Sequence, residues 1–126
     1  MQKKFISTSA IFGALAVILG AFGAHALKKN LSPEQLQVFE TAVRYQFYHV
    51  FALLATGILY KEYGSKKLMW AGRLFIAGIV LFSGSLYALT FLPENMKWIG
   101  VITPFGGLCF IVGWLFLGAA VLKKEI

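Results

Sequence analysis

Acidic residues are scarce in this chain, and their positions exclude some classes of membrane transporter. Only five occur in 126 residues, and none of them lies inside a long apolar run. All five are glutamates, at Glu34, Glu40, Glu62, Glu94 and Glu125. A proton-coupled transporter normally needs an ionisable group near the middle of the membrane. The sequence therefore argues against a small multidrug-exporter type of protein.

Other chemical motifs are lacking as well. No serine–histidine–acid set, phosphate-binding loop or metal-ligand cluster can be found in the sequence, so we expect neither enzyme activity nor a cofactor. The single cysteine, Cys109, lies inside an apolar run and has no partner for an intramolecular disulfide. The fold therefore does not depend on oxidation.

Charge is sparse too, and this identifies the class of protein. Only 13% of residues are charged and 59% are hydrophobic, whereas soluble domains carry roughly 25% charged residues. We therefore predict an integral membrane protein with the lipid bilayer as its first partner. The net charge of +7 comes from Lys and Arg in short gaps between apolar runs. In such gaps these residues are topology signals and headgroup contacts, so no nucleic-acid partner is expected.

Four apolar runs predict an all-α bundle of four transmembrane helices in one domain, residues 1–126. Spans of about 20 residues each use up most of this length. The predicted spans cover about 5–27, 42–60, 74–92 and 99–122. The first run could imitate a secretory signal, but its 23 uncharged residues exceed the usual apolar region of about 7 to 15.

The second span is expected to begin as an amphipathic helix at about residues 33–44. Ser32 is a good N-cap, Pro33 suits the first helical position, and Gln35 can close a capping box. Beyond Arg44, 16 residues pass before the next charge, which is short for a full span. One helix from Pro33 to about residue 60, roughly 42 Å long at 1.5 Å per residue, resolves the shortfall.

Two further local patterns give specific expectations. Glu40 and Arg44 are four residues apart and can form an ion pair on the surface of the second helix. In the fourth run, Pro104 either kinks the helix or begins it. Because Thr103 is a suitable N-cap, we predict that the helix starts there, after an interfacial lead-in from Trp98 to Ile102.

The distribution of Lys and Arg predicts the orientation in the membrane. One side of the bundle would hold eight of them, at Lys3, Lys4, Lys61, Lys66, Lys67, Arg73, Lys123 and Lys124. The other side would hold four, at Lys28, Lys29, Arg44 and Lys97. Because basic residues accumulate on the inner side, we expect a multi-pass protein of the cell inner membrane with both termini in the cytoplasm.

Polar residues gather where the second helix enters the membrane. Arg44, Tyr45 and Tyr48 can form an aromatic belt with an arginine that reaches the headgroups. Gln46 and His49 are costly in hydrocarbon and should bond to other helices. Their expected partners lie in the third span, at Ser83, Ser85 and Tyr87. Interhelical bonds contribute only about 1 kcal/mol each, so this pattern fits helix packing as well as a pore lining.

The two histidines allow a sharper hypothesis. His25 near the end of the first span and His49 in the second should lie at similar depth, so they could meet. They could then bind a metal or haem iron, or relay protons. The alternative is that each ring bonds to a neighbouring helix or to headgroups. A stable metal site usually needs three or four ligands, so the metal hypothesis is the weaker one.

Several short motifs together resemble a known family. They are Gly20-Ala-Phe-Gly-Ala-His25, Thr41-Ala-Val-Arg-Tyr-Gln-Phe-Tyr-His49, Leu81-Phe-Ser-Gly-Ser-Leu-Tyr87, and Ile102-Thr-Pro-Phe-Gly-Gly107 followed by Gly113-Trp114. The chain resembles, over essentially its whole length, the YgdD/YwdK-like family of small multi-pass membrane proteins. This is a domain-of-unknown-function family with an animal transmembrane relative. The resemblance implies a bacterial inner-membrane protein without an established activity.

The family's motif residues fall on positions already selected by polarity, which predicts one polar cluster. The candidate binding residues are His25, Arg44, Tyr45, Gln46, His49, Ser83, Ser85, Tyr87 and Thr103. Our leading hypothesis is a non-enzymatic protein that binds a membrane protein partner or a lipid through this cluster. A small-solute channel or carrier is the second hypothesis, and a two-histidine metal or haem redox subunit is the third. Small-residue faces in the first span also suggest a homo-oligomer.

Overall fold

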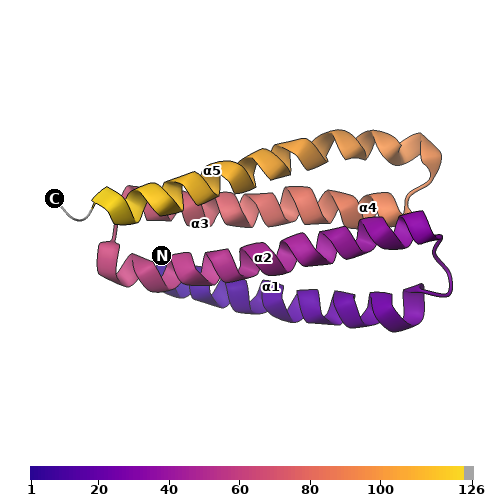
Figure 1. Ribbon diagram of the computed structural model, residues 1–126, viewed down its shortest axis with the longest axis horizontal. Helices are drawn as coiled ribbons and strands as arrows, with labels where there is room; N and C mark the ends of the chain where they lie inside the picture. Colours follow the sequence, from indigo (N-terminus) through magenta and orange to yellow (C-terminus); the bar gives the residue numbers. More distant parts are fainter. Residues whose placement is uncertain (124–126) are drawn as a thin grey trace.

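The computed structural model describes residues 1–123, and these are helical almost throughout, as the sequence predicted (Figure 1). Four long helical rods lie side by side, and short turns join them at alternate ends (Figure 1). Lys124 and Glu125, which entered the charge counts, lie outside the described residues. The first rod begins and the fourth rod ends at the same end of the bundle (Figure 1).

Two of the rods contain a π-helical turn, where the backbone hydrogen bonds are one residue longer than in an α-helix. The rods are α1 (Gln2–Phe22) with the π turn η1 (Gly23–Leu27); α2 (Pro33–Tyr63); α3 (Lys66–Gly78), the π turn η2 (Ile79–Ser83) and α4 (Gly84–Phe91); and the 3₁₀ helix η3 (Glu94–Val101) with α5 (Ile102–Lys123). The sequence predicted neither π turn. Such turns occur frequently at functional sites.

The start of α2 confirms the predicted cap. The Ser32 hydroxyl accepts a hydrogen bond from the Gln35 backbone N–H at 3.1 Å, and the Gln35 side-chain oxygen accepts one from the Ser32 N–H at 2.9 Å. Pro33 occupies the first helical position. From there a single helix runs to Tyr63, so the amphipathic segment and the second apolar run are continuous, as predicted.

The starts of the third and fourth rods differ from the sequence reading. α3 begins at Lys66, ahead of the predicted span at residues 74–92, because the Ser65 hydroxyl caps it by accepting from the Leu68 N–H at 3.2 Å. The prediction that Thr103 caps the fourth helix was wrong. α5 already begins at Ile102, directly after the 3₁₀ helix, and the Thr103 hydroxyl bonds to Ser85 instead.

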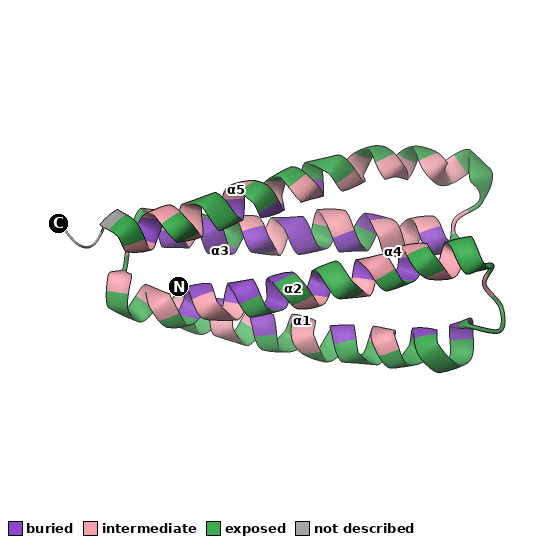
Figure 2. Ribbon diagram, in the orientation of Figure 1, coloured by how far each residue is buried: buried purple, intermediate pink, exposed green. Residues whose placement is uncertain are grey.

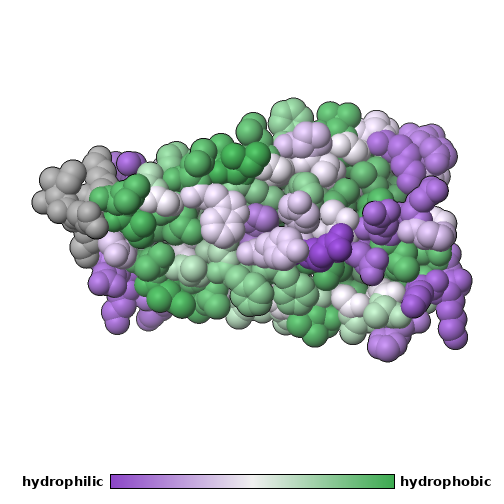
Figure 3. Space-filling view, in the orientation of Figure 1, coloured by the Kyte–Doolittle hydropathy of each residue, from purple (hydrophilic) through white to green (hydrophobic). Residues whose placement is uncertain are grey.

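Among residues 1–123, three rods are long and apolar enough to cross a membrane. They are Gln2–Leu27, Lys66–Phe91 and Glu94–Leu122. α2 is not among them: only 16 residues separate Arg44 from Lys61, and they include the polar Gln46 and His49. On the face that Figure 3 shows, hydrophobic side chains cover much of the middle, interrupted by a more polar strip, and hydrophilic ones gather toward the ends.

The buried residues lie on the faces that the rods turn toward one another (Figure 2). Phe5, Leu53, Phe75 and Phe110 lie in this core, and each is at most 4% exposed. Glycines allow the closest approach between rods. A Cβ at Gly106 of α5 would lie 2.4 Å from the backbone nitrogen of Phe82 in η2. The π turn and α5 therefore pack backbone against backbone.

Candidate functional site

Gln46 connects three rods at the centre of the bundle. Its side chain is 4% exposed. The amide nitrogen donates to the backbone carbonyl of Phe12 in α1 at 2.8 Å, and the amide oxygen accepts from the Tyr87 hydroxyl of α4 at 2.6 Å. The expected partnership of Gln46 with Tyr87 is therefore present, and the carbonyl on α1 adds a third helix to it.

Two serines near the second π turn make similar contacts. The Ser83 hydroxyl, which is fully buried, donates to the backbone carbonyl of Ala42 in α2 at 2.8 Å. The Ser85 hydroxyl donates to the Phe82 carbonyl at 2.9 Å and lies 2.5 Å from the hydroxyl of Thr103 in α5. Together with the Gln46 contacts, these bonds join all four rods through polar side chains.

Within residues 1–123, the hydrogen bonds of His49 do not go to the third-rod serines that were among its expected partners. Its Nδ1 lies 2.7 Å from the Tyr45 carbonyl one turn earlier, and its Nε2 accepts a hydrogen bond from the Trp114 indole N–H of α5 at 3.1 Å. A carbonyl can only accept and an indole N–H can only donate, so this geometry requires the neutral ring with its proton on Nδ1. The ring also stacks on Phe110, with 3.5 Å between the ring centroids. Neither ring nitrogen is left to bind a metal.

The remaining candidates lie at the surface. His25 is exposed on η1, and within residues 1–123 neither a hydrogen bond nor a ring contact joins it to His49. Arg44 is exposed and donates to the Thr41 hydroxyl at 3.3 Å. The predicted ion pair between Glu40 and Arg44 does not form, because the guanidinium turns to this hydroxyl instead.

A lateral groove lies beside His49, between α2, η2 and α5. We call it the aromatic groove. Its volume is about 390 Å³, and it is lined by Tyr45, His49, Phe82, Gly107, Phe110, Ile111 and Trp114. Sequence reasoning missed Phe82, Phe110 and Ile111, which look like ordinary lipid-facing residues. The signals that could have found this groove were the candidates Tyr45 and His49 and the motifs that contain Phe82, Gly107 and Trp114.

The chemistry available in this region is limited. Every buried side-chain nitrogen and oxygen among the described residues has a hydrogen-bond partner. Within residues 1–123 no three histidine, cysteine or acidic side chains gather where they could hold a metal ion. The buried polar groups are therefore already hydrogen-bonded within the protein. The aromatic groove offers mainly aromatic and aliphatic surface to a ligand.

Comparisons with known proteins agree with the motif resemblance. Residues 19–107 match a family described as a protein of unknown function, DUF423. A UPF0382 membrane protein of Staphylococcus saprophyticus is 47% identical over 122 residues, which cover 97% of this chain and 99% of that protein. The UPF0382 membrane protein YwdK of Bacillus subtilis is 44% identical over 123 residues, covering 97% and 98% of the two chains. No solved structure matches the chain.

Proposed function

Because this chain belongs to the DUF423 family of membrane proteins, whose function is unknown, we propose a function from its geometry. We propose that it is a non-enzymatic lipid-binding protein that holds an acyl chain in the aromatic groove. The polar residues beneath the groove then serve as the scaffold that shapes it. The binding surface is thus the aromatic groove, and not the polar cluster that was predicted from the sequence.

The observation that supports the proposal is an aromatic groove whose lining histidine, His49, has both ring nitrogens in hydrogen bonds. Ligand sites are typically clefts of about 300 to 1,000 Å³ with mainly apolar and aromatic linings, and the aromatic groove has about 390 Å³. It opens toward the lipid-facing side, where Ile111 is 58% and Trp114 is 47% exposed. The nitrogens of His49 are both engaged. A chain without polar groups therefore fits best.

We further propose that α2 crosses the membrane as a fourth span, with both termini in the cytoplasm. At 1.5 Å per residue, its 31 residues extend over about 46 Å, close to the roughly 40–45 Å of a whole bilayer. Its polar first turns would lie among the headgroups of the outer leaflet. The larger number of Lys and Arg at the other end supports a cytoplasmic location for that end.

Single cysteines test this topology in a Cys109→Ser background. In intact cells, a membrane-impermeant maleimide is expected to label Asn30→Cys and Asn95→Cys but not Lys66→Cys, which should react only after permeabilisation. The three positions are exposed and lie in or beside the turns between rods. Equal labelling of residues 30 and 66 would show that α2 does not cross, and the reverse pattern would invert the orientation.

Quenching of Trp114 fluorescence tests the aromatic groove. In a Trp70→Phe/Trp98→Phe protein, phospholipid with brominated acyl chains should quench Trp114 at about one lipid per protein in detergent. A Trp98-only protein provides the comparison, because Trp98 is 63% exposed outside the groove and reports general lipid contact. Quenching of Trp98 should require a large excess of the same lipid over protein.

A variant that fills the groove completes this test. Gly107→Leu should abolish the early quenching of Trp114, because a Cβ at Gly107 meets only ordinary contacts and its side chain can extend into the groove. Gly118→Leu is the matched control on the same helix, since nothing lies within 4 Å of its Cβ position. Quenching of Trp114 that needs as much lipid as quenching of Trp98 would contradict a specific acyl-chain site.

A further inference from the structure

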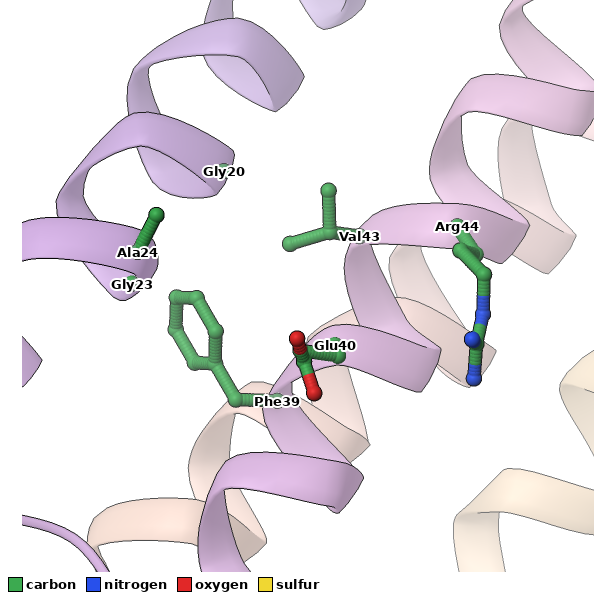
Figure 4. A pocket seen from close by; sticks show the side chains of 7 residues that line it. All are labelled: Gly20, Gly23, Ala24, Phe39, Glu40, Val43 and Arg44. Atoms are coloured by element: carbon green, nitrogen blue, oxygen red, sulfur yellow. The ribbon is translucent and has the colours of Figure 1, made fainter. Parts of the chain in front are cut away.

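A second cleft lies between the first rod and α2 (Figure 4). We call it the interfacial cleft. Its volume is about 240 Å³, and its lining residues are Gly20, Gly23, Ala24, Phe39, Glu40, Val43 and Arg44. The two clefts share no residue. Along α2 at 100° per residue, Glu40 and Arg44 lie on one side of the buried face and Tyr45 and His49 on the other.

Small residues create the apolar part of the interfacial cleft. Gly20, Gly23 and Ala24 form one wall, and Phe39 and Val43 point toward it from α2 (Figure 4). A Cβ at Gly23 would lie only 2.6 Å from the Phe39 ring, and one at Gly20 would lie 3.5 Å from Val43. Larger side chains on the first rod would therefore close the space.

Two opposite charges lie at the edge of this cleft without pairing. Glu40 and Arg44 have the four-residue spacing at which a glutamate and an arginine usually meet. Their side chains nevertheless extend apart (Figure 4), and within residues 1–123 the hydrogen bond of the guanidinium goes to the Thr41 hydroxyl and not to Glu40. Both charges are exposed and remain available to a ligand that carries an anion and a cation of its own.

The order of the two charges along α2 is informative. With α2 crossing the membrane as proposed above, the 16 uncharged residues from Tyr45 to Tyr60 span about 24 Å, less than the roughly 30 Å of hydrocarbon. Arg44 therefore lies at the hydrocarbon boundary. Glu40 lies one turn, about 6 Å, further toward the water. From the hydrocarbon outward, the cleft presents a cation first and an anion second.

We propose that the interfacial cleft binds an amine-bearing zwitterionic phospholipid of the phosphatidylethanolamine class. In such a lipid the phosphate is next to the glycerol and the ammonium is at the outer end, so the charges run in the complementary order. Arg44 then binds the phosphate through charge-assisted hydrogen bonds, and Glu40 accepts from the ammonium. The glycerol and the headgroup methylenes pack against Gly20, Gly23 and Val43, which lie at the depth of these two charges, and the acyl chains extend past Arg44 into the hydrocarbon. This site rests on the proposed crossing of α2 and not on the aromatic groove.

The test compares phosphatidylethanolamine with phosphatidylglycerol, which has the phosphate but no ammonium. Each lipid is titrated into the purified full chain in detergent, and dissociation constants are measured by native mass spectrometry. The unmodified protein should bind phosphatidylethanolamine at least about fivefold more tightly, since one charge near the surface has about this effect. Arg44→Gln should raise the dissociation constants of both lipids about fivefold. Glu40→Gln should remove the preference between them.

Exchanging the two charged residues tests whether their order along α2, and not only their net charge, determines the lipid preference. The variant Glu40→Arg/Arg44→Glu keeps the net charge but reverses the order, and it should lose the preference for phosphatidylethanolamine. Lys29→Gln removes an exposed charge at the same end that does not line the cleft, so its preference should be unchanged. Circular dichroism and thermal unfolding establish that each variant is folded, which these exposed positions should permit.

The outcomes that overturn the proposal are specific. They are equal affinity of the unmodified protein for the two lipids, a preference that survives Glu40→Gln, or a preference that survives the charge exchange. The lipids in this test differ only in their headgroups, so its result is independent of the Trp114 quenching experiment. Failure of the acyl-chain site in the aromatic groove would leave this headgroup preference intact.

Discussion

Replacing Gly106 with alanine is expected to reduce the free energy of unfolding by about 3 kcal/mol or more. The added methyl would lie 2.4 Å from the backbone nitrogen of Phe82 and 2.8 Å from its Cα. These are backbone atoms of the π turn η2, so no side-chain rotation can relieve the clash. The third and fourth rods would have to separate, and the aromatic groove between α2, η2 and α5 would lose its shape.

The neighbouring glycine provides a close control. A Cβ at Gly107 comes no nearer than 3.8 Å to Phe82, and one at Gly118 meets nothing within 4 Å. Both alanine variants should be neutral or more stable by about 0.5–1 kcal/mol, because alanine restricts the unfolded backbone. Unfolding in mixed micelles with increasing dodecyl sulfate, followed by circular dichroism, measures the difference. Equal stability of the alanine variants at 106 and 107 would show that the rods do not pack this closely.

Gln46→Leu is expected to cost about 2 kcal/mol, the second largest effect. The substitution removes the donor to the Phe12 carbonyl and the acceptor of the Tyr87 hydroxyl together. The hydroxyl, half-buried between helices, would then lose its partner. Tyr87→Phe alone should cost only about 1 kcal/mol, because Gln46 keeps its bond to Phe12.

The double variant distinguishes an unpaired hydroxyl from a general packing defect. Adding Tyr87→Phe to Gln46→Leu should recover about 1 kcal/mol, since it removes the unpaired group. Tyr48→Phe is the control, because Tyr48 is 54% exposed and makes no hydrogen bond within the described residues. Its stability should match that of the unmodified protein in the same unfolding titration. Additive losses for Gln46→Leu and Tyr87→Phe would contradict the bridge.

The features that could be predicted correctly from the sequence depend on residues that are close together in the chain. The cap of α2 depends on Ser32, Pro33 and Gln35, which are close together in the chain, and it was found as expected. The helical class follows from long apolar runs, which have few alternatives in a membrane. The π turn at Ile79–Ser83 could not be predicted in this way, because it is fitted to Gly106 on another rod.

The partners of buried polar residues were predicted only as a group of three in the third span, Ser83, Ser85 and Tyr87. Tyr87 does bond to Gln46, but none of the three was found as the hydrogen-bond partner of His49 within residues 1–123. Trp114 was not evident for His49, because it is 65 residues away and its place depends on how α5 rotates about its axis. That rotation is set by Gly106 and Gly113, whose Cβ positions approach Phe82 and Phe75 within 3 Å. Periodicity in one sequence carries no information on such contacts.

The hydrogen bonds of α2 also bear on the order in which the protein is assembled during synthesis. The amide nitrogen of Gln46 finds the Phe12 carbonyl on α1, which the ribosome has already made. The Gln46 oxygen can bond only after Tyr87 has been synthesised, and Nε2 of His49 only after Trp114, which comes later still. A nascent chain that stops after α2 therefore lacks the hydrogen-bond partners of two acceptors, the Gln46 oxygen and the His49 Nε2. The third rod supplies the donor for one acceptor and the fourth rod the donor for the other. Both acceptors are therefore hydrogen-bonded only when the whole chain has been made.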